Sequence, residues 1–135
     1  MGNRRKAREA ALQLLYPIDL GKFSPQELFP LFWKNQAEEE GTRDFTEHLV
    51  LGVTHNLKEI DELLEKHSTH WKLSRMSIVD RNILRMAVYE ILYCEDIPKS
   101  VTLNEAIDIG KKFGTEDSGA FINGVLDNLA KGVKN

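Results

Sequence analysis

The stretch from Ser77 to Tyr93 constrains the fold more than any other part of this sequence, because apolar residues surround most of its circumference at helical spacing. A helix that is apolar on nearly all sides belongs in the centre of a bundle. Helix-start patterns recur elsewhere, as at Ser24-Pro25-Gln26-Glu27, which combines a capping box with a proline at the first helical position. Almost nothing alternates with the period of two that a half-buried strand requires. The sequence therefore predicts an all-α fold.

Three helices are predicted before residue 55. The first spans about residues 3–16, and Pro17 is expected to kink or end it because proline clashes with the carbonyl four residues earlier. The second begins at Ser24, ends at the acidic run 38–40 and carries three apolar residues inward, namely Leu28, Leu31 and Phe32. The third covers about residues 42–54.

Four more helices are predicted after residue 55. Asn56 with Glu59, and Thr102 with Glu105, have the spacing of a capping box, so a helix is expected to begin at each pair. The other two helices cover about residues 77–93 and 116–131. No repeat or low-complexity linker divides the chain, so its 135 residues are predicted to form a single domain, 1–135.

Charge is distributed unevenly along the chain. The whole chain has a formal net charge of −3, yet residues 1–9 carry +3, which leaves −6 for the remainder. Cys94 is the only cysteine, which favours a reducing compartment. The apolar run after the basic start is interrupted by Gln13 and stops at Pro17, unlike a signal peptide. No apolar run approaches the ~20 residues of a membrane span. These features predict a cytoplasmic protein.

Patterns that would indicate an enzyme or a metal centre are incomplete. His48 and His55 lie two helical turns apart with no third ligand between them. No cysteine or carboxylate completes a set of four ligands with His67 and His70. The segment 114–119 has the glycine spacing of a phosphate loop, but it lacks the lysine and follows a predicted helix. The sequence predicts no metal, no cofactor and no catalysis.

The basic start places four cations at the beginning of the first predicted helix: Arg4, Arg5, Lys6 and Arg8. Each cation there opposes the helix dipole at a cost of roughly 0.3–1 kcal/mol. A polyanion would offset this cost, because Lys and Arg that neutralise phosphates release counterions. The alternative is a basic start that is simply solvated.

The negative remainder of the chain favours a short contact with a single strand over a broad platform for a duplex. Aromatic residues would complete such a site, and the candidates by type are Tyr16, Phe113 and Phe121. For all three, packing in the core is the alternative role.

Four stretches resemble the bacterial NusB transcription antitermination factors: "RRKAREAALQLLY" (4–16), "LGVTHN" (51–56), "VDRNILRMAVYEILY" (79–93) and "DIPKSVTLNEAIDIGKKFGTEDSGAFINGVLD" (96–127). The resemblance extends over essentially the whole chain, and the last stretch is its most specific part. It implies a compact bundle of about seven helices in two packed subdomains, with residues 1–135 as one NusB-like RNA-binding domain.

The resemblance also implies a function. Members of this family bind the boxA element of nascent ribosomal RNA leader transcripts as a heterodimer with NusE, a small-subunit ribosomal protein. The pair joins an RNA polymerase complex that resists termination, without catalysis or cofactor. A homodimer and a monomer both stay open for this chain.

Position by position, the resemblance gives the family's RNA contacts to Arg4, Arg5, Lys6, Arg8, Asp117, Ser118 and Phe121, and a NusE contact to Asp80. Phe121 is suited to stacking on a base. Ala120 stands where many members have a lysine, so one phosphate contact is expected to be missing. Pro17-Ile18 replaces a pair that often includes tryptophan.

Two other functions stay open at this point. A protein-interaction module would dock partners on its helical faces while the basic start stays idle. A stand-alone relative of the NusB-like domain of RNA cytosine methyltransferases would help to place a substrate RNA, although this chain has no cofactor-binding α/β domain.

Overall fold

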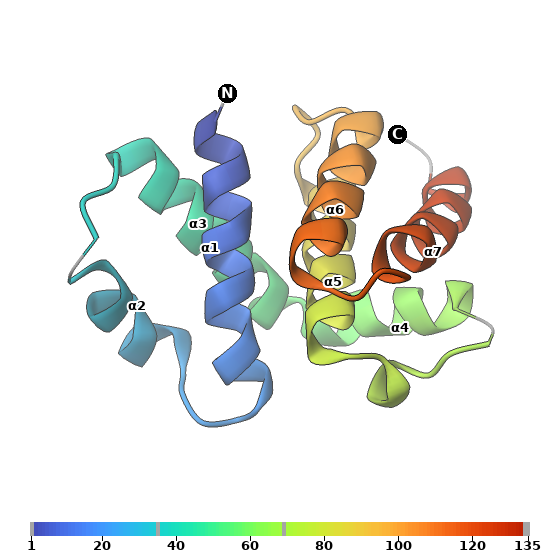
Figure 1. Ribbon diagram of the computed structural model, residues 1–135, viewed down its shortest axis with the longest axis horizontal. Coiled ribbons are helices and arrows are strands. Elements are labelled where there is room, and N and C mark those ends of the chain that lie inside the picture. The colour runs from blue at the N-terminus through green and yellow to red at the C-terminus, as the bar shows by residue number, and fades with distance from the viewer. Residues whose placement is uncertain (1, 35, 69, 134–135) are drawn as a thin grey trace. The chain divides into compact units, whose positions relative to one another are not determined.

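The structure is a computed structural model that describes residues 2–34, 36–68 and 70–133. These residues form seven α-helices and one short 3₁₀-helix, and none of them lies in a β-strand (Figure 1). The predicted all-α fold is therefore confirmed. The chain divides into two compact units, residues 1–55 with the first three helices and residues 56–135 with the rest.

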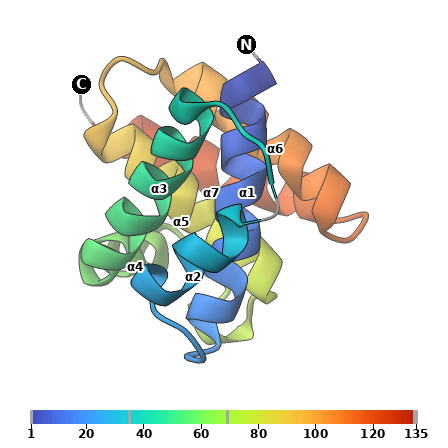
Figure 2. The same ribbon diagram turned by 90° about the vertical axis from the view of Figure 1, so that its left-hand side faces the viewer.

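The first unit consists of α1 (Gly2–Asp19), α2 (Pro25–Trp33) and α3 (Glu40–His55). Helices α1 and α3 lie against each other, as Figures 1 and 2 both show. The hydroxyl oxygen of Thr46 on α3 is 3.4 Å from the carbonyl oxygen of Ala7 on α1. Buried apolar residues recur at helical spacing on both helices: Ala7, Ala11, Leu14 and Leu15 on α1, and Leu49, Val50 and Val53 on α3. This spacing gives each helix one apolar face to bury.

Helix α1 runs to Asp19, beyond its predicted end at Tyr16, with Pro17 inside its last turn. Pro17 has no N–H to donate to the carbonyl four residues earlier, and the helix ends two residues beyond it. The helix then stops in a turn, where the N–H of Gly21 donates to the carbonyl of Ile18 at 2.9 Å. Gly21 has φ 76°, in the left-handed region that glycine adopts without steric cost.

Helix α2 begins with the predicted capping box. The N–H of Glu27 donates to the Ser24 hydroxyl at 3.3 Å, and the Ser24 N–H donates to the Glu27 carboxylate at 2.9 Å. The helix ends at Trp33, however, so the prediction that the acidic run 38–40 closes it is wrong.

The inward face of α2 also differs from the prediction. Leu31 is 62% exposed, and Trp33 is the residue of α2 that is buried. Its indole N–H donates to the Glu47 carboxylate on α3 at 2.8 Å, which removes the penalty for burying an indole N–H. A larger ring with a hydrogen-bond partner therefore occupies the inner side instead of the leucine.

The second unit is organised around α5 (Ile78–Tyr93). This helix contacts α4 (Leu57–His67), α6 (Lys99–Phe113) and α7 (Ser118–Gly132), which confirms its predicted central position. Helix α5 begins directly after Ser77, close to its predicted start, and Ser77 caps it, since its hydroxyl accepts the N–H of Asp80 at 3.0 Å. The core combines side chains from all four helices: Ile60, Leu64, Ile83, Leu84, Val88, Ile109, Ile122, Leu126 and Leu129.

Neither predicted capping box of the second unit forms. Asn56 stands at the N-cap position of α4, but its side chain makes no capping hydrogen bond. Helix α6 begins at Lys99, directly after Pro98, so Thr102 lies inside it. The Thr102 hydroxyl donates to Oε1 of Glu90 on α5 at 2.9 Å, and both side chains are buried. A buried carboxylate requires such a donor, which explains why Thr102 faces the core and leaves the helix end uncapped.

Another polar contact of the second unit joins α4 to α5. The guanidinium of Arg85 donates from Nε and Nη2 to the two carboxylate oxygens of Asp61, each at 2.9 Å. The Arg85 side chain is 10% exposed and that of Asp61 is 23% exposed. This bidentate contact pairs the charge of Arg85, which would destabilise the fold if it were buried without a partner.

Candidate nucleic-acid interface

The basic start forms the first two turns of α1, and the first turn contains no acidic residue. Arg4 and Lys6 are exposed and Arg5 is half-buried. Arg8, in contrast, is only 4% exposed. The structure therefore leaves Arg4, Arg5 and Lys6 as the cations of this helix that reach the surface.

An aromatic ring on α3 lies beside two of the arginines. The Cζ atom of Arg4 is 4.5 Å from the centroid of Phe45, and that of Arg8 is 5.6 Å from it. A guanidinium over an aromatic face gains about 0.5–1 kcal/mol at an exposed site. Part of the repulsion expected at the start of α1 is thus offset within the same unit.

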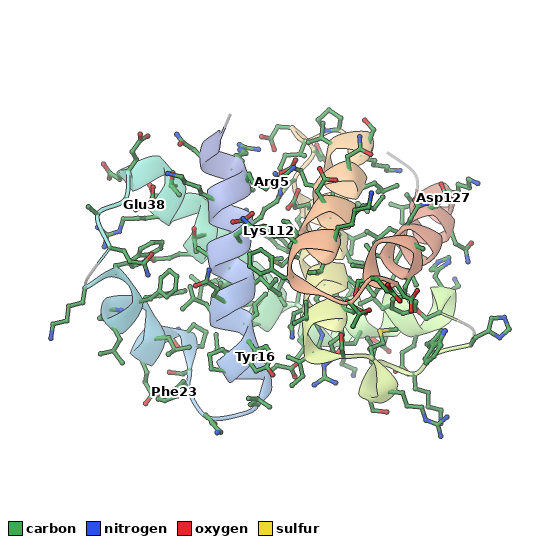
Figure 3. The ribbon with its side chains drawn as sticks, viewed as in Figure 1. Arg5, Tyr16, Phe23, Glu38, Lys112 and Asp127 are labelled. Carbon is green, nitrogen blue, oxygen red and sulfur yellow. The ribbon has the colours of Figure 1, made fainter. Side chains whose placement is uncertain are left out.

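Two residues of the acidic run, Glu38 (labelled in Figure 3) and Glu39, supply further compensation. Nζ of Lys6 is 4.0 Å from Oε1 of Glu38, and the Asn3 side chain donates to the Glu39 carboxylate at 3.0 Å. The Lys6 side chain is 65% exposed, and exposed pairs contribute only about 0–1 kcal/mol. Arg4, Arg5 and Arg8 also interact within the chain. A polyanion would therefore exchange with existing contacts of this helix.

The turn between α6 and α7 holds two more of the predicted residues. The N–H of Thr115 donates to the Ser118 hydroxyl at 2.9 Å, and the N–H of Ser118 donates back to the Thr115 carbonyl at 3.1 Å. A Cβ atom on Gly114 would lie 2.2 Å from the Ser118 oxygen, so the turn requires glycine there. Ser118 is buried and holds the turn, whereas Asp117 is exposed at the N-cap of α7.

Phe121, in the first turn of α7, forms an edge-to-face pair with Trp71. Their ring centroids are 5.9 Å apart and the rings are inclined at 78°. Phe121 is half-buried and Trp71 is 52% exposed. The geometry is the favourable one for two aromatic rings, so each ring holds the other in place while leaving aromatic surface open to solvent.

The Trp71–Phe121 pair lines two cavities of the second unit, with volumes of about 240 and 280 Å³. The smaller cavity lies beside the 3₁₀-helix η1 (Leu73–Arg75). Its other lining residues are Arg75, Met76, Ser77, Asp80, Thr115 and Asp117. The larger has a different polar lining, which includes His67, His70 and Asn128.

Asp80 occupies the first turn of α5, at the wall of the smaller cavity. Its Oδ1 atom is buried and accepts no hydrogen bond from any described residue. A buried acceptor without a partner costs about 1–3 kcal/mol. Such a group in a folded protein needs an explanation, and a water or a ligand is a common one.

The structure groups the predicted site residues into two sets. Arg4, Arg5, Lys6 and Arg8 share α1 in the first unit. The second unit brings Asp117, Phe121 and Asp80 to one cavity, although Asp80 was assigned to a protein contact and the other two to RNA. Ser118 belongs to the adjoining turn.

Sequence reasoning missed Trp71 and Phe45. Trp71 lies in a polar segment that contains no other large apolar residue between His67 and Lys72, and an isolated aromatic of that kind is a signal for a binding surface. Phe45 gave no such signal, because it lies at core spacing on α3. The other aromatic candidates, Tyr16 and Phe113, are 43% and 38% exposed, so neither is a core residue.

The remaining chemistry of the described residues lies elsewhere. No group of three or more His, Cys, Asp or Glu side chains among residues 2–34, 36–68 and 70–133 is arranged to hold a metal ion. Burial raises the pKa of the Tyr89 phenol, and Cys94 adds to the effect, but Tyr89 lines neither cavity. In the described part of the chain, no helix combines the length and the hydropathy that crossing a bilayer requires.

The fold and these surfaces define a class: a small all-α protein that carries a cationic helix start in one unit and an aromatic-lined cavity in the other. Comparison with known proteins gives the family. The sequence model of the NusB family matches residues 5–131, and the chain belongs to that family.

Relatives and solved structures agree with this assignment. The transcription antitermination protein NusB of Desulforapulum autotrophicum is 55% identical over 96% of this chain and 92% of its own length. Among solved structures, T. maritima NusB is 37% identical, with a TM-score of 0.84 over 95% of this chain and 90% of that one. A structure of the antitermination factors NusB and NusE in complex with dsRNA matches with 30% identity and a TM-score of 0.88, covering 98% of this chain and 99% of that one.

Proposed function

We propose that this protein is an RNA-binding transcription antitermination factor that recognises the boxA element of nascent ribosomal RNA leaders. It acts as a heterodimer with NusE and joins an RNA polymerase complex that resists termination. It contributes binding surfaces and no catalysis. Action on nascent bacterial transcripts places it in the cytoplasm.

The observation that carries the proposal is the near-complete match to a NusB that was solved together with NusE and dsRNA. The match covers 98% of this chain, so at most a few residues of the candidate surfaces lie outside it. Cations for phosphates and an aromatic pair for a base are the two components that single-stranded RNA sites combine.

The residues take different roles in this proposal. Arg4, Arg5 and Lys6 neutralise phosphates, because they are the cations of α1 that reach the surface. Arg8 is buried against Phe45 and positions the helix start.

In the second unit, Phe121 stacks on a base and Asp117 lies at the edge of the same cavity. Ser118 holds the turn that carries them. Ala120 is exposed in the first turn of α7 but brings no charge, and in this proposal NusE adds further surface for the RNA.

A binding titration tests the proposal. Fluorescence anisotropy of a labelled boxA RNA would be compared with that of a scrambled RNA of equal composition, with and without NusE. We expect NusE to raise the affinity for boxA more than for the scrambled RNA. Equal binding of both RNAs in the presence of NusE would contradict the proposal.

A variant pair locates the site. Phe121→Ala should lower the affinity for boxA, because losing a stacked base costs about 1–3 kcal/mol. Phe23→Ala is the matched control, since Phe23 is also an exposed aromatic but lies outside both candidate surfaces. Equal losses in the two variants would remove Phe121 from the site. A pull-down that captures NusE but no RNA would point to a protein-interaction module instead.

A further inference from the structure

The last turn of α6 carries two lysines, Lys111 and Lys112, and both are exposed. They differ in their surroundings. Nζ of Lys112 lies 5.2 Å from the ring centroid of Phe113, and Lys112 makes a further interaction within the chain. No hydrogen bond or ion pair joins the ammonium group of Lys111 to another residue of the ranges 2–34, 36–68 and 70–133. Lys111 is therefore the lysine of this pair whose charge has no partner in the described part of the chain.

The side chain of Lys111 lies across the start of the next helix. Helices α6 and α7 pack against each other in the second unit (Figure 1). A Cβ atom on Gly119 would lie 3.0 Å from Cγ of Lys111 and 3.1 Å from its Cε. Because both atoms approach the same point, the lysine stem runs along the backbone of residue 119. The absence of a side chain at Gly119 leaves the space that this apolar stem occupies.

The path of the stem brings the charge to the part of the RNA surface that lacks a cation. Phe121, the proposed base-stacking residue, follows Gly119 by two positions. Between them stands Ala120, at the position where the family resemblance implies a lysine. Helix α7 has no cation of its own before Lys131, at its other end. A base that stacks on an aromatic ring brings its backbone phosphates with it, and single-strand sites pair such rings with cations.

We propose that Lys111 is a phosphate-binding residue of this site. Its ammonium group neutralises the backbone phosphate beside the base that stacks on Phe121, in place of the lysine that other members of the family carry at the position of Ala120. Gly119 permits this because it leaves the path across α7 open. The inference rests on the proposed RNA-binding function and adds to it a residue that the resemblance does not assign.

Lys111→Met tests the contact, since methionine keeps most of the apolar stem and removes the charge. The assay is anisotropy of labelled boxA RNA with NusE present. One phosphate contact on a single strand contributes about 0.7 to the salt slope, so the affinity should fall about fivefold at about 0.1 M salt and the difference should shrink as salt rises. This effect adds to the share of the slope that α1 supplies. Lys131→Met is the matched control, because Lys131 is exposed at the opposite end of α7, where it pairs with Asp127 at 3.0 Å. It should leave the affinity almost unchanged.

A double-mutant cycle with Ala120→Lys tests whether the two positions serve the same phosphate. In the Lys111→Met protein, Ala120→Lys should restore the affinity, a gain of about fivefold at about 0.1 M salt. In the unaltered protein the gain should be clearly smaller, because one phosphate is neutralised only once and the two ammonium groups repel each other. Equal gains in both backgrounds would show that the two cations act on different phosphates and would overturn the inference.

Two further measurements separate an RNA contact from a structural role. The unfolding midpoint in urea and the affinity for NusE should be the same in Lys111→Met and in the unaltered protein. A loss of boxA affinity that does not change with salt, or that is matched by a loss of NusE binding, would overturn the phosphate contact.

The outcomes also separate this inference from the function on which it rests. If the unaltered protein with NusE does not bind boxA, the proposed function fails and the inference fails with it. If the unaltered protein and Lys111→Met bind boxA equally well at low salt, the function stands and the role of Lys111 is wrong.

Discussion

Removing the surface arginines of α1 should flatten the salt dependence of RNA binding by a predictable amount. Each phosphate neutralised on a single strand contributes about −0.7 to the slope of log K against log salt concentration. Four cations would give a slope of about −3, but Arg8 is buried, so the three surface cations predict about −2. The Arg4→Ala/Arg5→Ala double variant retains only Lys6 and should show about −0.7.

The assay is anisotropy of labelled boxA RNA at about 50 to 200 mM salt, for the protein alone and with NusE. Lys34→Ala is the control, because Lys34 is an exposed cation of the same unit that lies outside the first two turns of α1. Glu38→Gln should have the opposite effect to the double variant. It releases Lys6 from its ion pair and should raise the affinity up to about fivefold at low salt.

Two results would refute this reasoning. An unchanged slope in the double variant would show that α1 does not touch the RNA. A slope near −3 for the unaltered protein, falling by one full contact in Arg8→Met, would show that the buried arginine reaches a phosphate after all.

Three further predictions concern the scaffold. Asp61→Ala leaves Arg85 without its bidentate partner and should lower the free energy of unfolding by about 2–3 kcal/mol in urea titrations, below the usual range for fully buried pairs because Asp61 is partly exposed. Gly114→Ala forces a Cβ atom against the Ser118 hydroxyl and should cost about 1–3 kcal/mol, measured in the same way. Hydrogen bonds from the Ser24 N–H and hydroxyl lower the pKa of Glu27 from 4.5, so its stabilising effect is present above that pH and is lost as the pH falls; the unfolding midpoint of Glu27→Gln should lie below that of the unaltered protein at pH 7 and converge with it in acid.

The parts of the fold that depend on neighbouring residues were predictable from the sequence. The predicted cap at Ser24 and the predicted start of α5 at Ser77 both form, and each serine bonds to the residue three positions further on. The central position of α5 followed from its apolar circumference. These features need no knowledge of what lies across the core.

Two of the errors arose where a partner from another helix decided the outcome. Thr102 was assigned to a cap but bonds to Glu90, and Trp33 displaced Leu31 from the inner face because Glu47 satisfies its indole. Local patterns do not encode these pairings, since each joins residues on different helices.

The same distinction applies to the candidate site: some of its features were visible in the sequence and others depend on contacts between distant elements. The charge of the basic start and the aromatic at Phe121 were visible in the sequence. The burial of Arg8, the place of Asp80 beside Phe121 and the role of Trp71 were not, because each depends on how elements distant in the sequence meet.

Two cations at the positive end of α1, Arg4 and Lys6, make weak contacts that offset part of their unfavourable position. Phe45 offers its ring to Arg4, and Glu38 pairs with Lys6 across 4.0 Å in an exposed position. Contacts of this kind contribute about 1 kcal/mol or less each, so they stabilise the free protein without fixing the side chains. A phosphate can replace them at little cost, and it adds the entropy of released counterions, which a carboxylate of the same molecule cannot supply. The weakness of the Phe45 and Glu38 contacts is therefore a property that suits Arg4 and Lys6 to exchange them for RNA.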